Sequence, residues 1–191
     1  MNLGIKDEAF VRGKVPMTKE EIRILTLVKA QIAPDAVIYD VGAGTGSLSI
    51  EAARLAPAGH VYAIEKNPEA IGLIAENAKR FGTENITAIE GTAPDALEGL
   101  PALDVALIGG SGRKLSDILD IIGERLRPAG RIVANAITMQ TAAACLDYFH
   151  AHADRYTYEA IQVQINRLER VGSYDMAKAL NPIYIITAQR K

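Results

Sequence analysis

A glycine-rich turn between an apolar run and a helical pattern is the feature that most constrains this chain. Residues 37–46 have the sequence VIYDVGAGTG, in which Val37, Ile38 and Tyr39 are typical of a short buried strand. The glycines that follow allow a sharp turn and a close approach of the backbone to a ligand, because no Cβ is in the way. Since residues 47–55 have a helical pattern, we expect a strand, a turn and a helix N-terminus whose free N–H groups face a polar ligand.

A second apolar run ends in an acidic residue. Residues 61–64 predict another strand, which closes a βαβ unit, and Glu65 stands at its carboxyl end. A carboxylate in that position can accept hydrogen bonds from both hydroxyl groups of a ribose. The two strand ends together predict a binding site for a nucleoside cofactor.

The spacing of the glycines indicates which nucleoside. Dinucleotide sites have the pattern G-x-G-x-x-G, whereas Gly42, Gly44 and Gly46 give G-x-G-x-G. Preceded by Asp40, this D-x-G-x-G-x-G resembles the S-adenosylmethionine (SAM) site of class I methyltransferases and favours SAM over NAD. An NAD-linked dehydrogenase and a SAM-binding or nucleotide-binding regulatory module without chemistry stay as alternatives.

Length and charge limit the remaining classes of protein. The chain has 191 residues, of which 49% are hydrophobic, and this suits a single domain with a sizeable core. A formal net charge of −2 gives no general attraction to nucleic acid. No apolar run has the length of a membrane span, and the first ten residues lack the apolar region of a signal peptide. We therefore expect a cytoplasmic protein with neither a membrane nor a nucleic acid as partner.

The residues that most often bind metals or act as nucleophiles give no strong signal. Cys145 is the only cysteine, and its apolar helical context predicts a core residue. His150 and His152 are two positions apart and would point away from each other on a helix. We therefore predict no metal site and no catalytic thiol.

The N-terminal segment leads into a helix with a clear start signal. Residues 12–16, RGKVP, precede Thr18, which is expected to cap the helix, and Glu21 completes a T-x-x-E capping box. Met17 and Ile22 occupy the positions of a hydrophobic staple. We expect residues 1–33 to form this segment and its capped helix, and residues 34–191 to form the core of the same domain.

The rest of the chain alternates between strand and helix patterns. Helices are expected at residues 67–81, with Asn67 as cap, at 94–100, 114–126 and 139–152, and strands at 86–90, 104–108 and 131–137. The strand at 104–108 opens into Gly109, Gly110, Ser111 and Gly112, which leave room for a second, bulky ligand.

The chain ends in two long β-rich runs. Residues 156–168 and 183–188 are expected to pair as an antiparallel hairpin, and the loop 170–180 to fold over an edge of the site. The predicted fold is an α/β, Rossmann-like class I methyltransferase fold: a doubly wound seven-stranded sheet with a C-terminal antiparallel hairpin.

Several longer motifs carry a more specific resemblance. They are RGKVPMTKEE at residues 12–21, DVGAGTGSLSIEAA at 40–53, GGSG at 109–112, LRPAGRIVANA at 126–136 and ALNPIYIIT at 179–187. With them the chain resembles, along nearly its whole length, the decarboxylating precorrin (cobalt-precorrin) C15-methyltransferases of cobalamin biosynthesis. A tRNA adenine methyltransferase is the nearest rival within the superfamily, and the near-neutral charge weighs against it.

The resemblance implies SAM-dependent methylation of a corrin precursor at C15, coupled to decarboxylation of the ring C acetate, by a homotetramer. It also implies that Thr18 reaches over the cofactor and that the Ala93 backbone meets the adenine. Thr92 departs from the acid usual in the family, and Asp95 is a possible substitute. The cofactor-binding residues so implied are Thr18, Gly42, Ala43, Gly44, Thr45, Gly46, Glu65 and Ala93.

Methyl transfer to carbon requires mainly the alignment of donor and acceptor, so we predict no catalytic acid or base. The expected substrate is a polycarboxylate. Arg12, Lys14, Lys19 and Arg113 are the cations nearest the site in sequence, and residues 109–112 and Asn135 are expected to wall the macrocycle. The substrate residues predicted from these features are Arg12, Lys14, Gly109, Gly110, Ser111 and Asn135.

Overall fold

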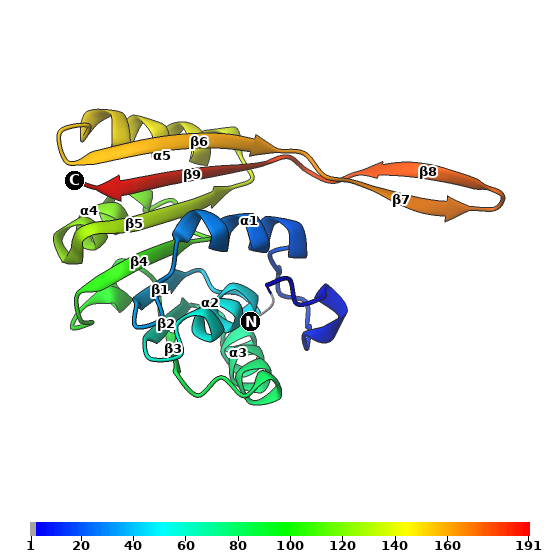
Figure 1. The fold of residues 1–191 in the computed structure, drawn as a ribbon, viewed down its shortest axis with the longest axis horizontal. Helices are drawn as coiled ribbons and strands as arrows, with labels where there is room; N and C mark the ends of the chain where they lie inside the picture. Colours follow the sequence, from blue (N-terminus) through cyan, green and yellow to red (C-terminus); the bar gives the residue numbers. More distant parts are fainter. Residues whose placement is uncertain (1–2) are drawn as a thin grey trace.

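The computed structural model describes residues 3–191, and its centre is a seven-stranded sheet in the order β3-β2-β1-β4-β5-β9-β6 (Figure 1). The strands are β1 (Val37–Val41), β2 (His60–Glu65), β3 (Ile86–Glu90), β4 (Leu103–Ile108), β5 (Leu126–Ala136), β6 (Tyr156–Val163) and β9 (Ile183–Arg190). The first five run parallel, and β9 is antiparallel to both β5 and β6. The predicted doubly wound sheet with an antiparallel ending is confirmed.

Helices cover both faces of this sheet (Figure 1). The helices α1 (Glu20–Ala30), α2 (Ser47–Leu55) and α3 (Pro68–Phe81) lie on one face, and α4 (Leu115–Arg125) and α5 (Met139–Ala151) on the other. Short 3₁₀ turns occupy Asp7–Ala9 and Asp95–Leu97, so the helix predicted at residues 94–100 is a single turn. In α4 the buried side chains follow the i, i+3, i+4, i+7 spacing, which explains why this segment is helical. None of the helices in the described chain is long and apolar enough to cross a membrane.

The register of the parallel strands brings the sequence motifs together. Val41 lies level with Ile64 of β2 and with Ile108 of β4, and Ile108 lies level with Ala134 of β5. The next residues along these strands are Gly42, Glu65, Gly109 and Asn135. The four therefore lie together at the carboxyl ends of the strands, where the chain leaves β1 and β4 towards opposite faces of the sheet and a crevice forms.

The C-terminal part differs from the expectation. The strand predicted at residues 156–168 is two strands, because β6 ends at Val163 and β7 begins at Asn166. The predicted loop 170–180 is wrong: β7 (Asn166–Val171) and β8 (Tyr174–Ala179) form a hairpin that projects far beyond the sheet (Figure 1). Gly172, at φ +65°, and the following serine supply the two-residue turn, which is the signal that the prediction overlooked.

The start of α1 also differs. The capping-box prediction is wrong, because the helix begins at Glu20 with Lys19 as N-cap and no side-chain cap bond. The carbonyl of Thr18 instead accepts a hydrogen bond at 2.6 Å from Nη1 of Arg23, a fully buried side chain. A buried guanidinium, rather than a threonine hydroxyl, therefore sets the entry into α1. By contrast, the predicted Asn67 cap of α3 is confirmed, since its Oδ1 accepts from the Glu69 N–H at 3.0 Å.

Candidate active site at the carboxyl ends of the central strands

A cavity of about 340 Å³ lies where β1, β4 and β5 end. It is bounded by the segment before α1, the two glycine loops and the base of the projecting hairpin. Six of the predicted site residues line it: Thr18, Gly42, Ala43, Gly44, Gly109 and Asn135. Its other lining residues are Pro16, Met17, Lys19, Ile22, Ile137, Ile165, Leu180, Asn181 and Ile183. All five of the longer sequence motifs thus contribute residues to one cavity.

The glycine loop is shaped by close backbone contacts on two sides. Gly42, Gly44 and Gly46 all have positive φ, at +75°, +57° and +77°. A Cβ on Gly42 would lie 2.7 Å from the backbone N of Gly110, and one on Gly44 would lie 2.7 Å from the carbonyl oxygen of Pro16. The absence of side chains therefore lets the loop after β4 and the segment before α1 pack directly on this turn.

Glu65 is held firmly beside the glycine loop. One carboxylate oxygen accepts from the Gly44 N–H at 3.0 Å, and the other accepts from the N–H groups of Lys66 at 2.8 Å and Asn67 at 3.0 Å. These bonds fix the orientation of the carboxylate at the end of β2. One lone pair remains, on the oxygen bonded to Gly44, and it can accept from a hydroxyl group of a ligand.

A second carboxylate lies under the loop. Asp40 is 1% exposed, and one of its oxygens accepts a hydrogen bond from the Ser49 hydroxyl, whereas the other has no partner in the described part of the chain. Burial raises the pKa of Asp40 to about 6; the bonds from Ser49 oppose this shift, and the charge of Glu65 adds to it. The floor of the site is therefore acidic, and part of its acceptor capacity is unused.

The raised pKa of Asp40 predicts a pH-dependent stability. A carboxyl whose folded pKa of about 6 exceeds its ordinary 3.8 stabilises the fold below the lower value, and this contribution is lost as the pH rises through about 6. We therefore expect ligand-free Asp40→Asn to be more stable than the wild type at pH 8, by up to about 3 kcal/mol. The gain should shrink towards pH 4. Urea unfolding at both pH values checks this, with the exposed Asp154→Asn as control; a pH-independent difference would contradict it.

Asn77 of α3 connects the N-terminal segment to the glycine loop, a role that was not predicted. Its side chain is fully buried, and its Oδ1 accepts from the Val11 N–H at 2.8 Å. Its Nδ2 donates to the carbonyls of Val11 at 3.1 Å and Thr45 at 3.0 Å. A signal was present, because Asn77 continues the buried stripe of Ala70 and Ile74. A polar residue on an apolar helix face needs buried partners.

The Asn77 contacts predict a loss of both stability and cofactor affinity on substitution. Asn77→Asp keeps the shape of the side chain and the oxygen that accepts from the Val11 N–H. Its second oxygen, however, has no proton to donate to the carbonyls of Val11 and Thr45. We expect the unfolding free energy to fall by about 1–3 kcal/mol for each unsatisfied group, and the affinity for S-adenosylhomocysteine to fall with it. Denaturant unfolding and calorimetry measure the two effects. The exposed neighbour Glu76→Gln should change neither, and an unchanged affinity in a folded Asn77→Asp would refute the connection.

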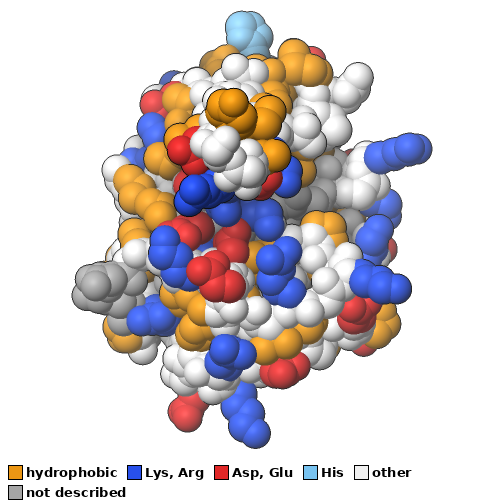
Figure 2. Space-filling model, turned by 90° about the vertical axis from the view of Figure 1, so that its right-hand side faces the viewer, with side chains coloured by type: hydrophobic (Ala, Val, Ile, Leu, Met, Phe, Trp, Pro, Cys, Tyr) orange, Lys and Arg blue, Asp and Glu red, His pale blue; other side chains and the backbone are white. Residues whose placement is uncertain are grey.

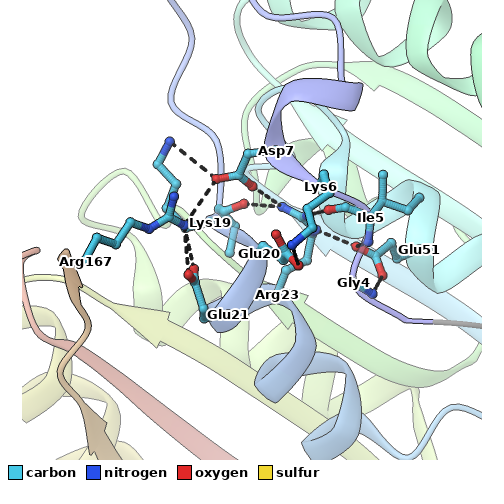
Figure 3. Close-up of polar contacts among 11 residues, drawn as sticks. Gly4, Ile5, Lys6, Asp7, Lys19, Glu20, Glu21, Arg23, Glu51 and Arg167 are labelled. Carbon is cyan, nitrogen blue, oxygen red and sulfur yellow. Dashed lines mark hydrogen bonds and ion pairs between the residues drawn. The ribbon is translucent and has the colours of Figure 1, made fainter. Parts of the chain in front are cut away.

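Arg23 organises a buried charged cluster behind the site (Figure 3). Its guanidinium pairs with Glu51 of α2 at 2.6 Å and with Asp7 at 3.1 Å, and it also donates to the carbonyls of Ile5 and Thr18. Glu51 in turn accepts from the N–H groups of Gly4 at 2.8 Å and Ile5 at 3.2 Å. The cluster thus anchors the start of the chain against α1 and α2.

The projecting hairpin reaches the same cluster at its base. Arg167 of β7 makes two bonds to the Glu21 carboxylate, at 2.9 and 2.8 Å, and lies 3.9 Å from Asp7. Lys19 lies 3.7 Å from the same Asp7 oxygen (Figure 3). The hairpin base, the start of α1 and the N-terminal segment are therefore linked by charge on one side of the cavity.

The other predicted residues lie outside the lining of the cavity. Thr45 and Gly46 complete the turn, and Thr45 is fully buried. Ala93 is 6% exposed after β3. Arg12 and Lys14 are exposed near the N-terminus of α3, where the Lys14 N–H donates to Glu69 at 3.2 Å. Ser111 is partly exposed in the loop after β4.

Cys145 is confirmed as a core residue. It is 0% exposed on α5, within the cluster that joins α4 and α5 to the sheet. Burial raises the pKa of its thiol to about 12. The thiol therefore has the apolar, buried environment of a structural cysteine.

Comparisons with known proteins agree on one family. A family model described as a precorrin methyltransferase domain matches residues 8–190. The chain is 39% identical over 188 residues to the cobalt-precorrin-6B C(15)-methyltransferase (decarboxylating) of Salmonella typhimurium, covering 98% of this chain and 96% of that protein.

Two solved structures are similar over nearly their whole length. A precorrin-6y C5,15-methyltransferase from Geobacter metallireducens matches with a TM-score of 0.91 and 40% identity, covering 98% of each chain. A precorrin 8w decarboxylase from Methanobacterium thermoautotrophicum matches with a TM-score of 0.90 and 35% identity, covering 96% of this chain and 98% of that one.

Proposed function

Because the chain belongs to the precorrin methyltransferase family and is therefore a methyltransferase, we propose that it methylates C15 of a corrin precursor and decarboxylates the ring C acetate. The observation that carries this proposal is the full-length match to a decarboxylating C15-methyltransferase, with the glycine loop and Glu65 in place at the strand ends. The family match supports neither a tRNA adenine methyltransferase nor an NAD-linked dehydrogenase.

The residues of the site fit SAM as cofactor. Gly42 and Gly44 line the cavity without a side chain, and one oxygen of the buried Asp40 has no partner among the described residues. The Asp40 and Glu65 carboxylates suit the ammonium group and the ribose hydroxyls of SAM. When bound, SAM supplies an electrophilic methyl group. We assign Glu65 to the ribose, residues 42–46 and Thr18 to the methionine part, and the Ala93 backbone to the adenine. Asp95 follows Ala93 by two residues in the sequence. We propose that its carboxylate replaces the acid that the family usually has at the position of Thr92.

The assignment of Glu65 predicts a weaker cofactor complex in Glu65→Gln. The amide forfeits charge-assisted acceptance and presents its NH₂ group to backbone N–H groups. We expect binding of S-adenosylhomocysteine to weaken by about 1.5–3 kcal/mol in calorimetry. Glu90→Gln, at the level of Glu65 on β3, is the matched control. Unchanged affinity in Glu65→Gln would exclude the ribose contact.

Cations surround the mouth of the site and suit a polycarboxylate. Figure 2 looks onto this end of the molecule and shows Lys and Arg side chains spread around it, with acidic side chains among them. Within residues 3–191, Arg12, Lys14 and Arg113 form no ion pair, so their charges are available to a ligand. We propose that they bind substrate carboxylates, while Gly109, Gly110, Ser111 and Asn135 border the acceptor ring.

The order of the two reactions follows from the chemistry of the substrate. An unactivated acetate retains its carboxylate, whereas a macrocycle made electron-poor by methylation can accept the electron pair left by carbon dioxide. The chain therefore needs to align the ring carbon and exclude water rather than supply a strong base. Single-turnover mass spectrometry, with cobalt-containing and metal-free precorrins in parallel, tests the proposal. Methylation before carbon dioxide loss is expected; decarboxylated, unmethylated product formed without SAM would overturn it.

The projecting hairpin supports an oligomer. A two-stranded ribbon is marginally stable alone, and Leu168, Tyr174 and Met176 are 74%, 74% and 56% exposed on it. We propose that the hairpin packs on further copies of this chain and that the protein is a tetramer. Light scattering should give the tetramer mass for the wild type and a smaller species for Tyr174→Asp. The cytoplasmic location and the absence of a nucleic-acid partner stay predictions.

A further inference from the structure

A partly exposed apolar strip adjoins the cavity on the side of β5 and the hairpin base. We call the strip formed by Ile137, Ile165 and Leu180 the apolar shelf. Ile137 is 61% exposed and the other two are half-buried, whereas most large apolar side chains of the sheet and helices are buried. All three line the same cavity as the glycine loop. The shelf is therefore continuous with the site where the methyl donor is proposed to bind.

The backbone fixes both sides of the shelf. The Leu180 N–H donates to the Ile165 carbonyl at 2.9 Å, which joins the two arms of the hairpin at its base. Ile137 directly follows the last residue of β5, Ala136, which is paired with Tyr184 of β9. An apolar surface that is both exposed and preorganised is typical of a binding site.

The polar groups around the shelf are few and lie at its border. Asn135, Asn181 and Lys19 line the cavity beside it. Thr26 orients Asn135: its hydroxyl accepts from Nδ2 of Asn135 at 3.0 Å, and its one proton is shared between the Ile22 carbonyl at 2.7 Å and Oδ1 of Asn135 at 3.1 Å. The amide oxygen of Asn135 has a second lone pair that can accept from a ligand. Apolar walls with a polar border match a ligand that has an apolar face and a polar edge.

From this geometry we infer that the apolar shelf binds the face of the tetrapyrrole ring, with one edge of the ring inserted into the cavity. This inference rests on the proposed function. A cavity of about 340 Å³ is at the small end of ligand sites, so a macrocycle can place only an edge in it beside the methyl donor. The rest of the ring needs an apolar surface immediately outside, and its carboxylates need the cations at the mouth. The shelf residues thus set the affinity for the acceptor and leave the affinity for the cofactor unchanged.

Substitutions at Ile137 test the shelf. Ile137→Ser removes the apolar side chain, and Ile137→Glu adds a negative charge as well. Both should weaken binding of cobyrinic acid, a stable corrinoid that keeps its carboxylates, and raise KM for the precorrin, by at least about tenfold. Calorimetry should give the same affinity for S-adenosylhomocysteine within about twofold. Val28→Glu, an equally exposed apolar position on α1 outside the cavity lining, is the matched control and should behave as the wild type.

The possible results separate the shelf from the other proposals. If the wild type neither binds the corrinoid nor methylates a precorrin, the proposed function fails and the shelf fails with it. If the wild type is active and Ile137→Ser matches it, the shelf is wrong, because the effect of Ile137→Glu would then be charge repulsion alone. If Ile137→Ser changes the mass in light scattering but not KM, the strip is a subunit contact and the inference is overturned.

Discussion

Gly42→Ala is expected to abolish measurable binding of S-adenosylhomocysteine and to lower the unfolding free energy by about 2–5 kcal/mol. Two effects add. Alanine is strained at φ +75°, and its Cβ would lie 2.7 Å from the N and 2.9 Å from the O of Gly110. Because these are backbone atoms at the end of β4, they cannot turn aside as a flexible side chain could. The loops after β1 and β4 would have to separate, and the proposed cofactor site at residues 42–46 would be distorted.

Gly99→Ala is the matched control for this prediction. Gly99 has a nearly equal φ of +73°, but within residues 3–191 no atom beyond Gly99 and its two chain neighbours lies within 4 Å of the point that a Cβ would occupy there. Its substitution should therefore cost only the conformational strain, about 1–2 kcal/mol, with unchanged affinity for S-adenosylhomocysteine. Denaturant unfolding and calorimetry on both variants give the comparison. Equal losses in the two variants would mean that the contact between Gly42 and Gly110 is unimportant.

The parts of the site that could be predicted are those encoded by local patterns. The glycine spacing after an apolar run and the acid at the end of the next run depend on neighbours within a few residues, and the parallel sheet then aligns them by register. Asn135 and Gly109 were found for the same reason, since each lies at the end of a strand. The doubly wound sheet and its antiparallel ending followed from the alternation of patterns along the chain.

The parts that could not be predicted depend on pairs distant in sequence. Thr18 has the pattern of a helix cap, yet the carbonyl of Thr18 is used by Arg23, whose partners Asp7 and Glu51 lie on other elements. Asn77 likewise acts on Val11 and Thr45. Tertiary contacts of this kind override local signals, and nothing in the spacing of the residues identifies the partner. The hairpin of β7 and β8 was missed because both of its faces mix apolar and charged residues, so that the turn at Gly172 was its main local signal.

Arg23→Met is expected to lower the unfolding free energy by about 3–5 kcal/mol, because the carboxylates of Asp7 and Glu51 would stay buried without a counter-charge. The affinity for S-adenosylhomocysteine should fall as well, since Arg23 holds the Thr18 carbonyl next to the cavity. Urea unfolding and calorimetry measure both. Lys178→Met, which removes a cation from the exposed pair with Glu169, should cost less than about 1 kcal/mol.

Replacing the whole cluster by apolar residues separates two functions: balancing its own charges and satisfying the hydrogen bonds of nearby backbone groups. Buried ion clusters can often be replaced by apolar residues at no cost, because the charges leave together. Here the charged side chains also satisfy backbone groups: the N–H groups of Gly4 and Ile5 and the carbonyls of Ile5 and Thr18. We therefore expect Asp7→Leu/Arg23→Met/Glu51→Met to remain destabilised, since these groups would lose their partners. A triple variant as stable as the wild type, with full cofactor affinity, would show that the cluster balances only its own charges.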